Sequence, residues 1–234
     1  MGRMQFRTTV FAGLAGALLL SACGEKTPTE AEGPAPIVLE TPPAGQLPTG
    51  VTPTAYRVDL MTDPAADTFS GHVEIDVRLD APHGRIWLHS IDQEISKVVA
   101  RLPDGSEVSG KFEGGLADGG VSKIDFNDAL PAGKLTLVID YTAPYNMGLA
   151  GLYKSTQNDR PYLSTQMEPI DARRMMPSFD EPRFKTPWTF TVTAPQGSQV
   201  VTNGPLKATS TLDNGMVRSE FATTRPIQTY LVAL

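Results

Sequence analysis

The sequence predicts an all-β domain, built as a large saddle-like or sandwich arrangement of curved antiparallel sheets and preceded by a disordered tether. Short apolar runs recur roughly every ten residues, a spacing typical of sandwiches and curved sheets. Many of these runs alternate between apolar and polar side chains. Between them lie most of the chain's 20 prolines and 21 glycines, which favour turns over long helices.

The first 22 residues have the pattern of a secretory signal peptide. Arg3 and Arg7 precede an apolar run over 10–20, and small residues follow it. A bilayer-spanning helix takes about 20 residues, so this run is too short to cross a membrane. We therefore expect residues 1–22 to direct export.

The segment ends in Leu-Ser-Ala-Cys-Gly at 20–24, which resembles the bacterial lipobox. This resemblance implies that Cys23 is the site of lipid attachment and that the protein is anchored to a bacterial membrane, facing the periplasm. Gly24 favours the outer membrane. Cys23 is the sole cysteine, so no intrachain disulfide can form in this exported chain. The alternative is an ordinary signal sequence with a free thiol.

Residues 23–50 form the predicted tether. The segment nearly lacks aromatic residues and contains six prolines, at positions 28, 34, 36, 42, 43 and 48. Such a composition favours an extended spacer and cannot bury enough apolar surface to offset chain entropy.

Residues 51–234 are long enough for one domain with a substantial core. The net charge of −6 offers no basic surface for nucleic acid, so we expect no nucleic-acid partner. Alternation over 56–60, 73–79, 135–141 and 190–192 predicts strands with one buried face. Strand-like residues also occur over 86–88 and at 98–99.

The later part of the chain holds three further local signals. Asp213-Asn214-Gly215 predicts a hairpin loop between strand-like runs at 206–212 and 216–221. Residues 170–176 could make a short helix, which Pro177 would end. The apolar, strand-like run at 230–234 stops abruptly, and from this we expect a chain cut inside a longer protein.

Gln166 and Glu168 are the candidate binding residues. If residues 163–169 are extended, side chains two apart share a face, so Gln166 and Glu168 are presented together. A carboxylate beside a neutral acceptor suits an α-ammonium group, which titrates at about 7.7–8.0. The competing interpretation is an ordinary solvated strand face.

The stretch 165–182, TQMEPIDARRMMPSFDEP, resembles the substrate-anchoring segment of the aminopeptidase N family of zinc metallopeptidases. The shared features are Gln-x-Glu, Ala-Arg and Phe-Asp-Glu-Pro, with Ser178 where the family often has cysteine. The resemblance implies that Gln166 lines the first specificity pocket and that Glu168 binds the free α-amino group of a peptide. Six short matches extend it in family order over nearly all of 51–234: 53–58, 69–73, 86–89, 151–155, 201–205 and 230–233.

For the remaining candidate residues, the sequence context favours structural roles over catalytic ones. Asp180 and Glu181 are adjacent and precede a proline, so a turn role is favoured over acid–base catalysis. Arg173 and Arg174 are expected to pair with nearby acids. Trp87 and Trp188 are interpreted as core or interface residues.

The three histidines, at 72, 83 and 89, do not form the H-E-x-x-H motif of a helical zinc site. We therefore assign no metal ligand and no catalytic residue to this chain. The resemblance implies that zinc binds in the full-length enzyme, to ligands from a C-terminal catalytic domain. Alone, the chain is expected to be inactive and to bind no stoichiometric zinc.

The resulting hypothesis is an N-terminal substrate-anchoring domain of a zinc aminopeptidase that removes N-terminal residues from peptides. Its implied partners are peptides with free N-termini, the zinc catalytic domain and a membrane. Two alternatives remain: a non-catalytic periplasmic lipoprotein that acts as a binding or scaffold module, and a family member that hydrolyses an epoxide.

Overall fold

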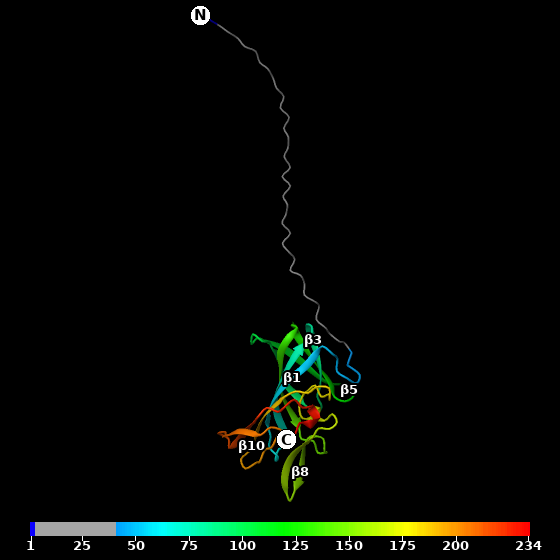
Figure 1. Cartoon of the computed structure of the whole chain (residues 1–234), viewed down its shortest axis with the longest axis vertical. Coiled ribbons are helices and arrows are strands. Elements are labelled where there is room, and N and C mark those ends of the chain that lie inside the picture. The colour runs from blue at the N-terminus through cyan, green and yellow to red at the C-terminus, as the bar shows by residue number, and fades with distance from the viewer. Residues whose placement is uncertain (3–40) are drawn as a thin grey trace. The chain divides into compact units, whose positions relative to one another are not determined.

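A computed structural model describes residues 1–2 and 41–234 (Figure 1). The chain divides after Gly33, and everything below concerns the second unit, Pro34–Leu234. The predicted signal peptide, Cys23 and most of the predicted tether lie outside the described residues. These assignments therefore stay predictions.

The described part of the chain is an all-β structure, as predicted. Ten strands form one sheet in the order β11-β12-β10-β1-β2-β7-β4-β5-β6-β3, and β8 pairs with β9 in a separate two-stranded sheet. The strands are β1 (Val51–Met61), β2 (Thr68–Leu79), β3 (His83–His89), β4 (Glu94–Arg101), β5 (Glu107–Ala117), β6 (Val121–Leu130), β7 (Gly133–Pro144), β8 (Gly151–Gln157), β9 (Arg160–Gln166), β10 (Trp188–Pro195), β11 (Leu206–Thr211) and β12 (Met216–Phe221). Two short 3-10 helices, η1 (Ala172–Arg174) and η2 (Thr229–Leu231), complete it.

Strand β2 shows how the sequence pattern produces the sheet. Val73, Ile75 and Val77 are buried, while the residues between them are partly exposed. This is the predicted period of two, in which one face of the strand packs into the core. β2 pairs with β1 on one side and with β7 on the other, so it lies in the middle of the sheet.

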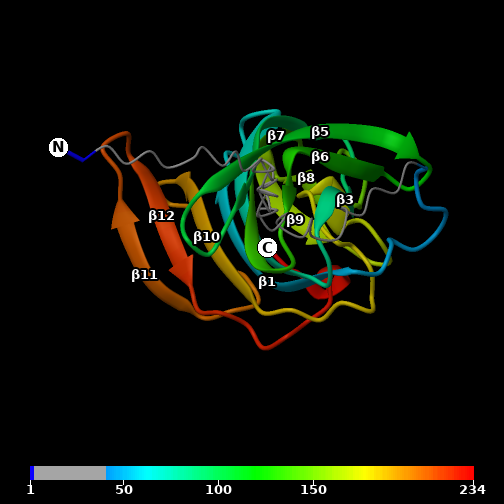
Figure 2. The same cartoon turned by 90° about the horizontal axis from the view of Figure 1, so that it is seen from above.

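The predicted curvature is also present. β5 pairs with β4 around Val99 and Ser109, and then with β6 from the pair Gly110 and Phe126 onward. Because one strand leaves its first neighbour as it joins the next, the sheet turns a corner there. In Figure 2 the sheet curves from the β11–β12 hairpin round to β5 and β6.

One strand pair departs from the antiparallel prediction. β1 and β10 run parallel, with Tyr56 opposite Trp188. Their rings stack at 3.9 Å, and both side chains are fully buried. Parallel neighbouring strands need a long connection between them, which here runs through β2 to β9. Local sequence patterns could therefore not predict that β1 pairs with β10. Trp87 is also buried, so both tryptophans are core residues.

The prediction of a strand at 230–234 was wrong. The segment forms η2 and then an irregular extended end. Its backbone groups bond to side chains instead of a neighbouring strand: Asn203 Nδ2 donates to the Leu231 carbonyl, and the Ala233 amide donates to Asn203 Oδ1, both at 2.8 Å. The predicted hairpin at 213–215 is confirmed by β11 and β12. The predicted helix at 170–176 is reduced to the single turn η1.

The predicted tether, residues 23–50, has one buried residue near its end. Leu47 is 4% exposed and belongs to the hydrophobic core. Its amide donates to Glu181 Oε1 at 2.5 Å, and its carbonyl accepts from Arg183 Nη2 at 2.7 Å. The last residues of the predicted tether are therefore docked on the domain by side chains far along the chain.

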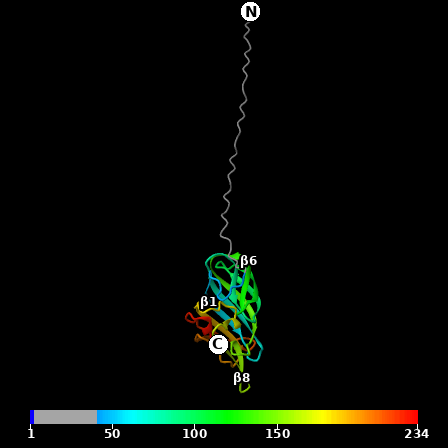
Figure 3. The same ribbon diagram turned by 90° about the vertical axis from the view of Figure 1, so that its right-hand side faces the viewer.

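The β8–β9 hairpin projects from the rest of the domain (Figure 3). Its two-residue loop, Asn158 and Asp159, has positive φ angles of 50° and 59°, as in a type I′ turn. Within the described residues, no helix has both the length and the hydropathy to span a membrane.

Candidate functional site

The candidate site lies where β9 ends. Gln166 is the last residue of β9, opposite Gly151 of β8. Gln166 and Glu168 are exposed, whereas Met167 between them is 1% exposed and packs in the core. The structure thus presents both polar side chains to solvent from one short segment, although Glu168 follows the strand and does not belong to it.

Local hydrogen bonds fix this segment. The Glu168 amide donates to Gln166 Oε1 at 3.0 Å, which folds the Gln166 side chain toward Glu168. The peptide bond between Glu168 and Pro169 is cis. The Asp171 amide then donates to the Met167 carbonyl at 2.8 Å and closes the turn that leads into η1. The polar pair therefore extends from a segment held by a buried side chain and by backbone bonds.

Gly151 allows β8 to approach this turn. Its φ is +65°, and a Cβ added there would lie 2.6 Å from Arg174 Cβ and 3.4 Å from the Asp171 carbonyl. Any larger residue would push the start of β8 away from η1. Since Gly151 faces Gln166 across the hairpin, the contact also sets the position of the candidate site.

A buried ion pair supports the far side of the turn. Arg173 Nε lies 2.9 Å from Asp180 Oδ2, with the side chains 5% and 1% exposed. Arg173 Nη2 donates to the Asp180 carbonyl at 2.8 Å and Nη1 donates to the Gly119 carbonyl. Asp180 Oδ1 accepts from Thr229 Oγ1 at 2.5 Å. The pair therefore ties η1 to the β5–β6 turn and to η2.

These contacts confirm the structural interpretation of the adjacent acids and arginines. Glu181 accepts from the Leu47 amide and from Arg183 Nε, so it is also part of the framework. Arg174 Nε pairs with Asp171 Oδ1 at 2.8 Å, and its Nη1 lies 3.8 Å from Asp92. Among the described residues, no cation pairs with Glu168, so its carboxylate is open to a ligand.

The histidines do not form a metal site. His89 is buried beside the Arg173 and Arg183 guanidiniums; burial, followed by these two charges, lowers its pKa to about 3. His83 begins β3, and burial lowers its pKa as well. His72 lies on an outer strand face, with Nδ1 2.5 Å from Asp140 Oδ1. Throughout residues 1–2 and 41–234, no three His, Cys, Asp or Glu side chains converge as metal ligands.

Sequence reasoning proposed Gln166 and Glu168 as binding residues but gave no sign of the residues that hold them in place. Nothing in the sequence marked Gly151 as a residue that positions the site, because a glycine at the start of a strand has many explanations. Thr229 and Gly119 lie far from η1 in the sequence, so no local pattern connects them to it. The Asp180 side chain could have been suspected only from its place in the Phe-Asp-Glu-Pro motif.

With this geometry established, comparison with known proteins adds the family context. Residues 52–231 match the family model described as the peptidase M1 N-terminal domain. The match covers the ten-stranded sheet, the β8–β9 hairpin and both 3-10 helices. The docked residue Leu47 lies outside the matched range.

Curated relatives are similar over the same part of the chain. Aminopeptidase A of Gloydius brevicauda is 30% identical over 194 residues, which is 80% of this chain and 20% of that protein. Glutamyl aminopeptidase of Homo sapiens is 28% identical over 197 residues, again 80% of this chain and 20% of that protein. Aminopeptidase N of Acetobacter pasteurianus is 30% identical over 196 residues, 82% of this chain and 54% of that protein. The chain thus spans about a fifth of the first two relatives and about half of the third.

Proposed function

The chain belongs to the peptidase M1 family through its N-terminal domain, and on this premise we propose that it anchors the amino end of a peptide for a zinc aminopeptidase. The observation that carries the proposal is the exposed pair at the end of β9. Glu168 offers a carboxylate with no cation partner among the described residues, and Gln166 lies beside it.

The chemistry of this pair suits a free α-amino group. At neutral pH an α-ammonium is largely protonated and carries N–H donors, so a carboxylate can take one charge-assisted hydrogen bond from it. The second lone pair of Gln166 Oε1 can accept another, because its first is used by the Glu168 amide. A peptide with a blocked amino end offers no such charge, which makes the arrangement selective for exopeptidase substrates.

Zinc would be bound outside this chain. M1 aminopeptidases are zinc-dependent, and the described residues do not fit a zinc site, since His89 is buried near two arginines and His72 is on the outer face. We therefore assign this domain one task, which is to bind and orient the amino end so that the first peptide bond has a fixed position. The metal and the groups that act with it would belong to a catalytic domain.

The test is Glu168→Gln in the full-length protein. Loss of the carboxylate should raise KM for an aminoacyl amide and lower kcat/KM at least about tenfold, the range expected when a charged hydrogen bond is lost. Glu94→Gln, at an exposed glutamate on β4, is the matched control and should leave both constants unchanged. Unchanged kinetics in the Glu168 variant would contradict the proposed role.

Substrate comparison separates the alternatives. A wild-type protein that cleaves aminoacyl amides but not their N-acetylated forms fits the aminopeptidase proposal. Turnover of an epoxide alone would assign the chain to an epoxide hydrolase within the family. A full-length protein with no turnover of either substrate would leave the non-catalytic lipoprotein module.

We also propose that Cys23 carries a lipid anchor that holds the protein at a bacterial membrane, facing the periplasm. The support is the residue pattern over 1–24. Wild-type protein should incorporate labelled palmitate and sediment with membranes, and density-gradient separation would distinguish outer from inner membrane. Cys23→Ser should abolish labelling and release the exported protein. Labelling that survives this substitution would exclude Cys23 as the lipid site.

A further inference from the structure

The chain contains two Asn-Gly pairs, Asn203-Gly204 and Asn214-Gly215. This dipeptide is chemically labile, because glycine has no side chain that shields its backbone nitrogen from the neighbouring asparagine amide. Each pair lies in a connection between strands, and each asparagine is exposed. The contacts around the two pairs differ, however, and the difference leads to different chemical stability.

The reaction at such a pair is a loss of ammonia. The glycine nitrogen gives up its proton and attacks the asparagine Cγ; the Cγ–Nδ2 bond breaks, Nδ2 takes up a proton and leaves as ammonia, and a succinimide ring closes. Water then opens the ring at either carbonyl carbon. One opening gives aspartate, and the other gives isoaspartate, in which the main chain runs through the side-chain carbons.

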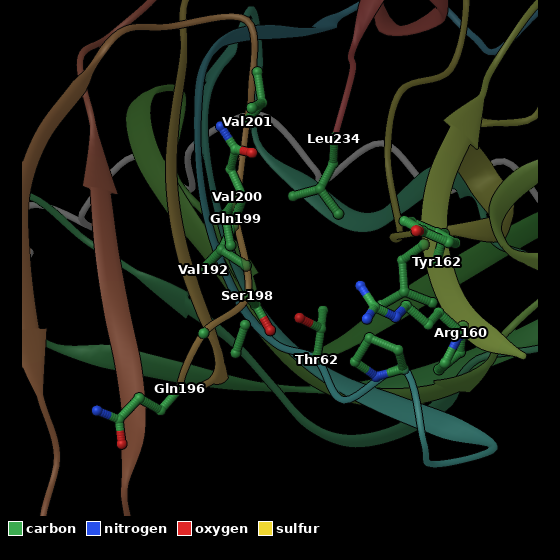
Figure 4. Close-up of a pocket in the computed structure, with 15 residues that line it drawn as sticks. Thr62, Arg160, Tyr162, Val192, Gln196, Ser198, Gln199, Val200, Val201 and Leu234 are labelled. Atoms are coloured by element: carbon green, nitrogen blue, oxygen red, sulfur yellow. The ribbon is translucent and has the colours of Figure 1, made fainter. Parts of the chain in front are cut away.

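Asn203 is held at both ends of its side-chain amide. Nδ2 donates to the Leu231 carbonyl, and Oδ1 accepts from the Ala233 amide, both at 2.8 Å. These bonds join the segment that follows β10 to the segment that begins with η2, and Figure 4 shows Val201 on the first and Leu234 on the second. Rotation of the Asn203 amide toward the glycine nitrogen would break both bonds.

Gly204 is held as well. It is buried, and a Cβ added to it would lie 2.1 Å from the Ala222 carbonyl oxygen. The next residue, Pro205, accepts at its carbonyl from the Ala222 amide at 2.9 Å. The attacking nitrogen of this pair therefore belongs to a backbone that is packed against the residue after β12, with little room to approach Asn203 Cγ.

Asn214 lies in the loop of the β11–β12 hairpin, which forms one end of the sheet (Figure 2). Asn214 and Gly215 are both exposed. Among the described residues, the Asn214 side chain has one hydrogen bond, from the Met216 amide to Oδ1 at 3.0 Å, and the leaving nitrogen Nδ2 has none. No described atom outside the neighbouring residues lies within 4 Å of a Cβ added to Gly215, so this loop has space to move.

One hydrogen bond restrains the attacking nitrogen. The Gly215 amide donates to the Leu212 carbonyl at 2.9 Å, so this turn must open before the nitrogen can reach Asn214 Cγ. Local opening of an exposed loop costs far less free energy than unfolding of the domain. At Asn203, by contrast, the asparagine must break two side-chain bonds and a buried glycine must move.

We propose that Asn214 is a site of spontaneous deamidation, where the chain acquires isoaspartate, and that the contacts of Asn203 protect it from the same reaction. The product changes the hairpin, since isoaspartate lengthens the main chain of a loop whose hydrogen bonds fix the pairing of β11 with β12. β11 pairs only with β12, so a distorted loop loosens this edge of the sheet. The site is separate from the proposed amino-anchoring role of Glu168.

Ageing of the full 234-residue chain in mild detergent at slightly alkaline pH tests the site. Peptide mass spectrometry, with electron-transfer fragmentation to identify isoaspartate, would follow both pairs relative to the sample taken at the start. Product at 214 should form at least about fivefold faster than product at 203, because Asn203 has one more hydrogen bond to break and a buried glycine beside it. Equal rates at the two pairs, or no product at 214, would overturn the proposal.

The same measurement in guanidinium chloride separates the effect of the fold from that of the sequence. In the unfolded chain both pairs lose their contacts, so their rates should lie within about twofold of each other. A fivefold difference that persists in the unfolded chain would show that the contacts of Asn203 do not protect it, which contradicts the proposal.

Trypsin cleavage after Lys207, an exposed residue of β11, reports on the hairpin. Aged wild-type chain should be cut there at least about threefold faster than fresh chain, because a loosened strand opens more often. Asn214→Asp adds the same charge but keeps an ordinary main chain, so fresh Asn214→Asp protein should be cut at the fresh wild-type rate. Aged wild type that is cut no faster than fresh protein would show that the hairpin is not loosened.

Asn214→Gln is the control for ageing at other positions. Its longer side chain closes the corresponding ring far more slowly, so the aged variant should be cut after Lys207 at the rate of the fresh variant. If ageing accelerates cleavage of Asn214→Gln as much as that of wild type, the change arises at another site and the proposal is wrong.

Discussion

Arg173 Nε lies 2.9 Å from Asp180 Oδ2, and both side chains are almost completely buried. The carboxylate also receives the Arg173 amide and the Thr229 hydroxyl, so its lone pairs are well satisfied. The arginine in turn donates to two carbonyls, at Gly119 and Asp180. A buried pair with this many hydrogen bonds can offset the cost of removing two charges from water, but a broken pair cannot.

Asp180→Asn is therefore expected to lower the free energy of unfolding by about 3–5 kcal/mol, since it leaves a buried guanidinium without its counterion. Urea denaturation followed by tryptophan fluorescence would measure the change. The control is Asp59→Asn, which breaks the partly exposed 2.7 Å pair with Arg218 and should cost at most about 1 kcal/mol. Equal costs for the two variants would show that the buried pair contributes nothing special.

Gly151→Ala should destabilise the hairpin end that carries Gln166. The change combines a positive φ, costing about 1–2 kcal/mol, with a Cβ only 2.6 Å from Arg174 Cβ, which adds about 1–3 kcal/mol. Gly215→Ala measures the cost of the positive φ alone, because Gly215 has a φ of +79° and nothing lies within 4 Å of an added Cβ. Unfolding measurements should place the Gly151 variant clearly below the Gly215 variant, and equal losses would exclude the steric contact.

Leu47→Ala tests whether the end of the predicted tether is part of the folded domain. Removal of a buried leucine side chain typically costs about 2–5 kcal/mol, whereas Leu206→Ala, at a residue that is 55% exposed, should cost less than about 0.5 kcal/mol. Denaturant midpoints with an unchanged slope would measure both. A Leu47 variant as stable as wild type would mean that the domain folds without this residue.

The fold class was predictable because the strands repeat every two residues and turn residues separate them. The alternation at Val73, Ile75 and Val77 is a property of the local sequence, and burial on one side follows directly from it. The placement of Gln166 and Glu168 was likewise local, since two residues flanking one buried methionine emerge on the same side.

What could not be predicted depends on partners far along the chain. Leu47 looks like any apolar residue in a proline-rich spacer until Glu181 and Arg183 bind its backbone. The apolar end at 230–234 has the composition of a strand, yet the Asn203 side chain hydrogen-bonds to two of its backbone groups and no strand forms. In both cases a side chain satisfies backbone groups, which leaves no periodic signal in the sequence.

His89 gives the domain a specific response to acid. Its ring is 2% exposed and lies beside the Arg173 and Arg183 guanidiniums, with the carboxylates of Asp180 and Glu181 already bound to these arginines. Burial and the two positive charges lower the pKa of His89 from 6.5 to about 3. Between these values the unfolded chain binds a proton at this residue and the folded chain does not. Stability contributed by the neutral ring is therefore lost as the pH falls from 6.5 toward 3.

From pH 7 to pH 5 this residue should account for about 2 kcal/mol of the loss in unfolding free energy. His89→Gln removes the titrating group while it keeps a polar side chain, so the difference between the two pH values should shrink by that amount whatever the variant's stability at pH 7. Leu206→Ala, at an exposed residue that does not titrate, should keep the wild-type difference. Urea unfolding of the three proteins at both pH values provides the comparison. If the His89 variant loses as much stability as wild type on acidification, the ring is already reached by protons in the folded state and the pocket around it is open to water.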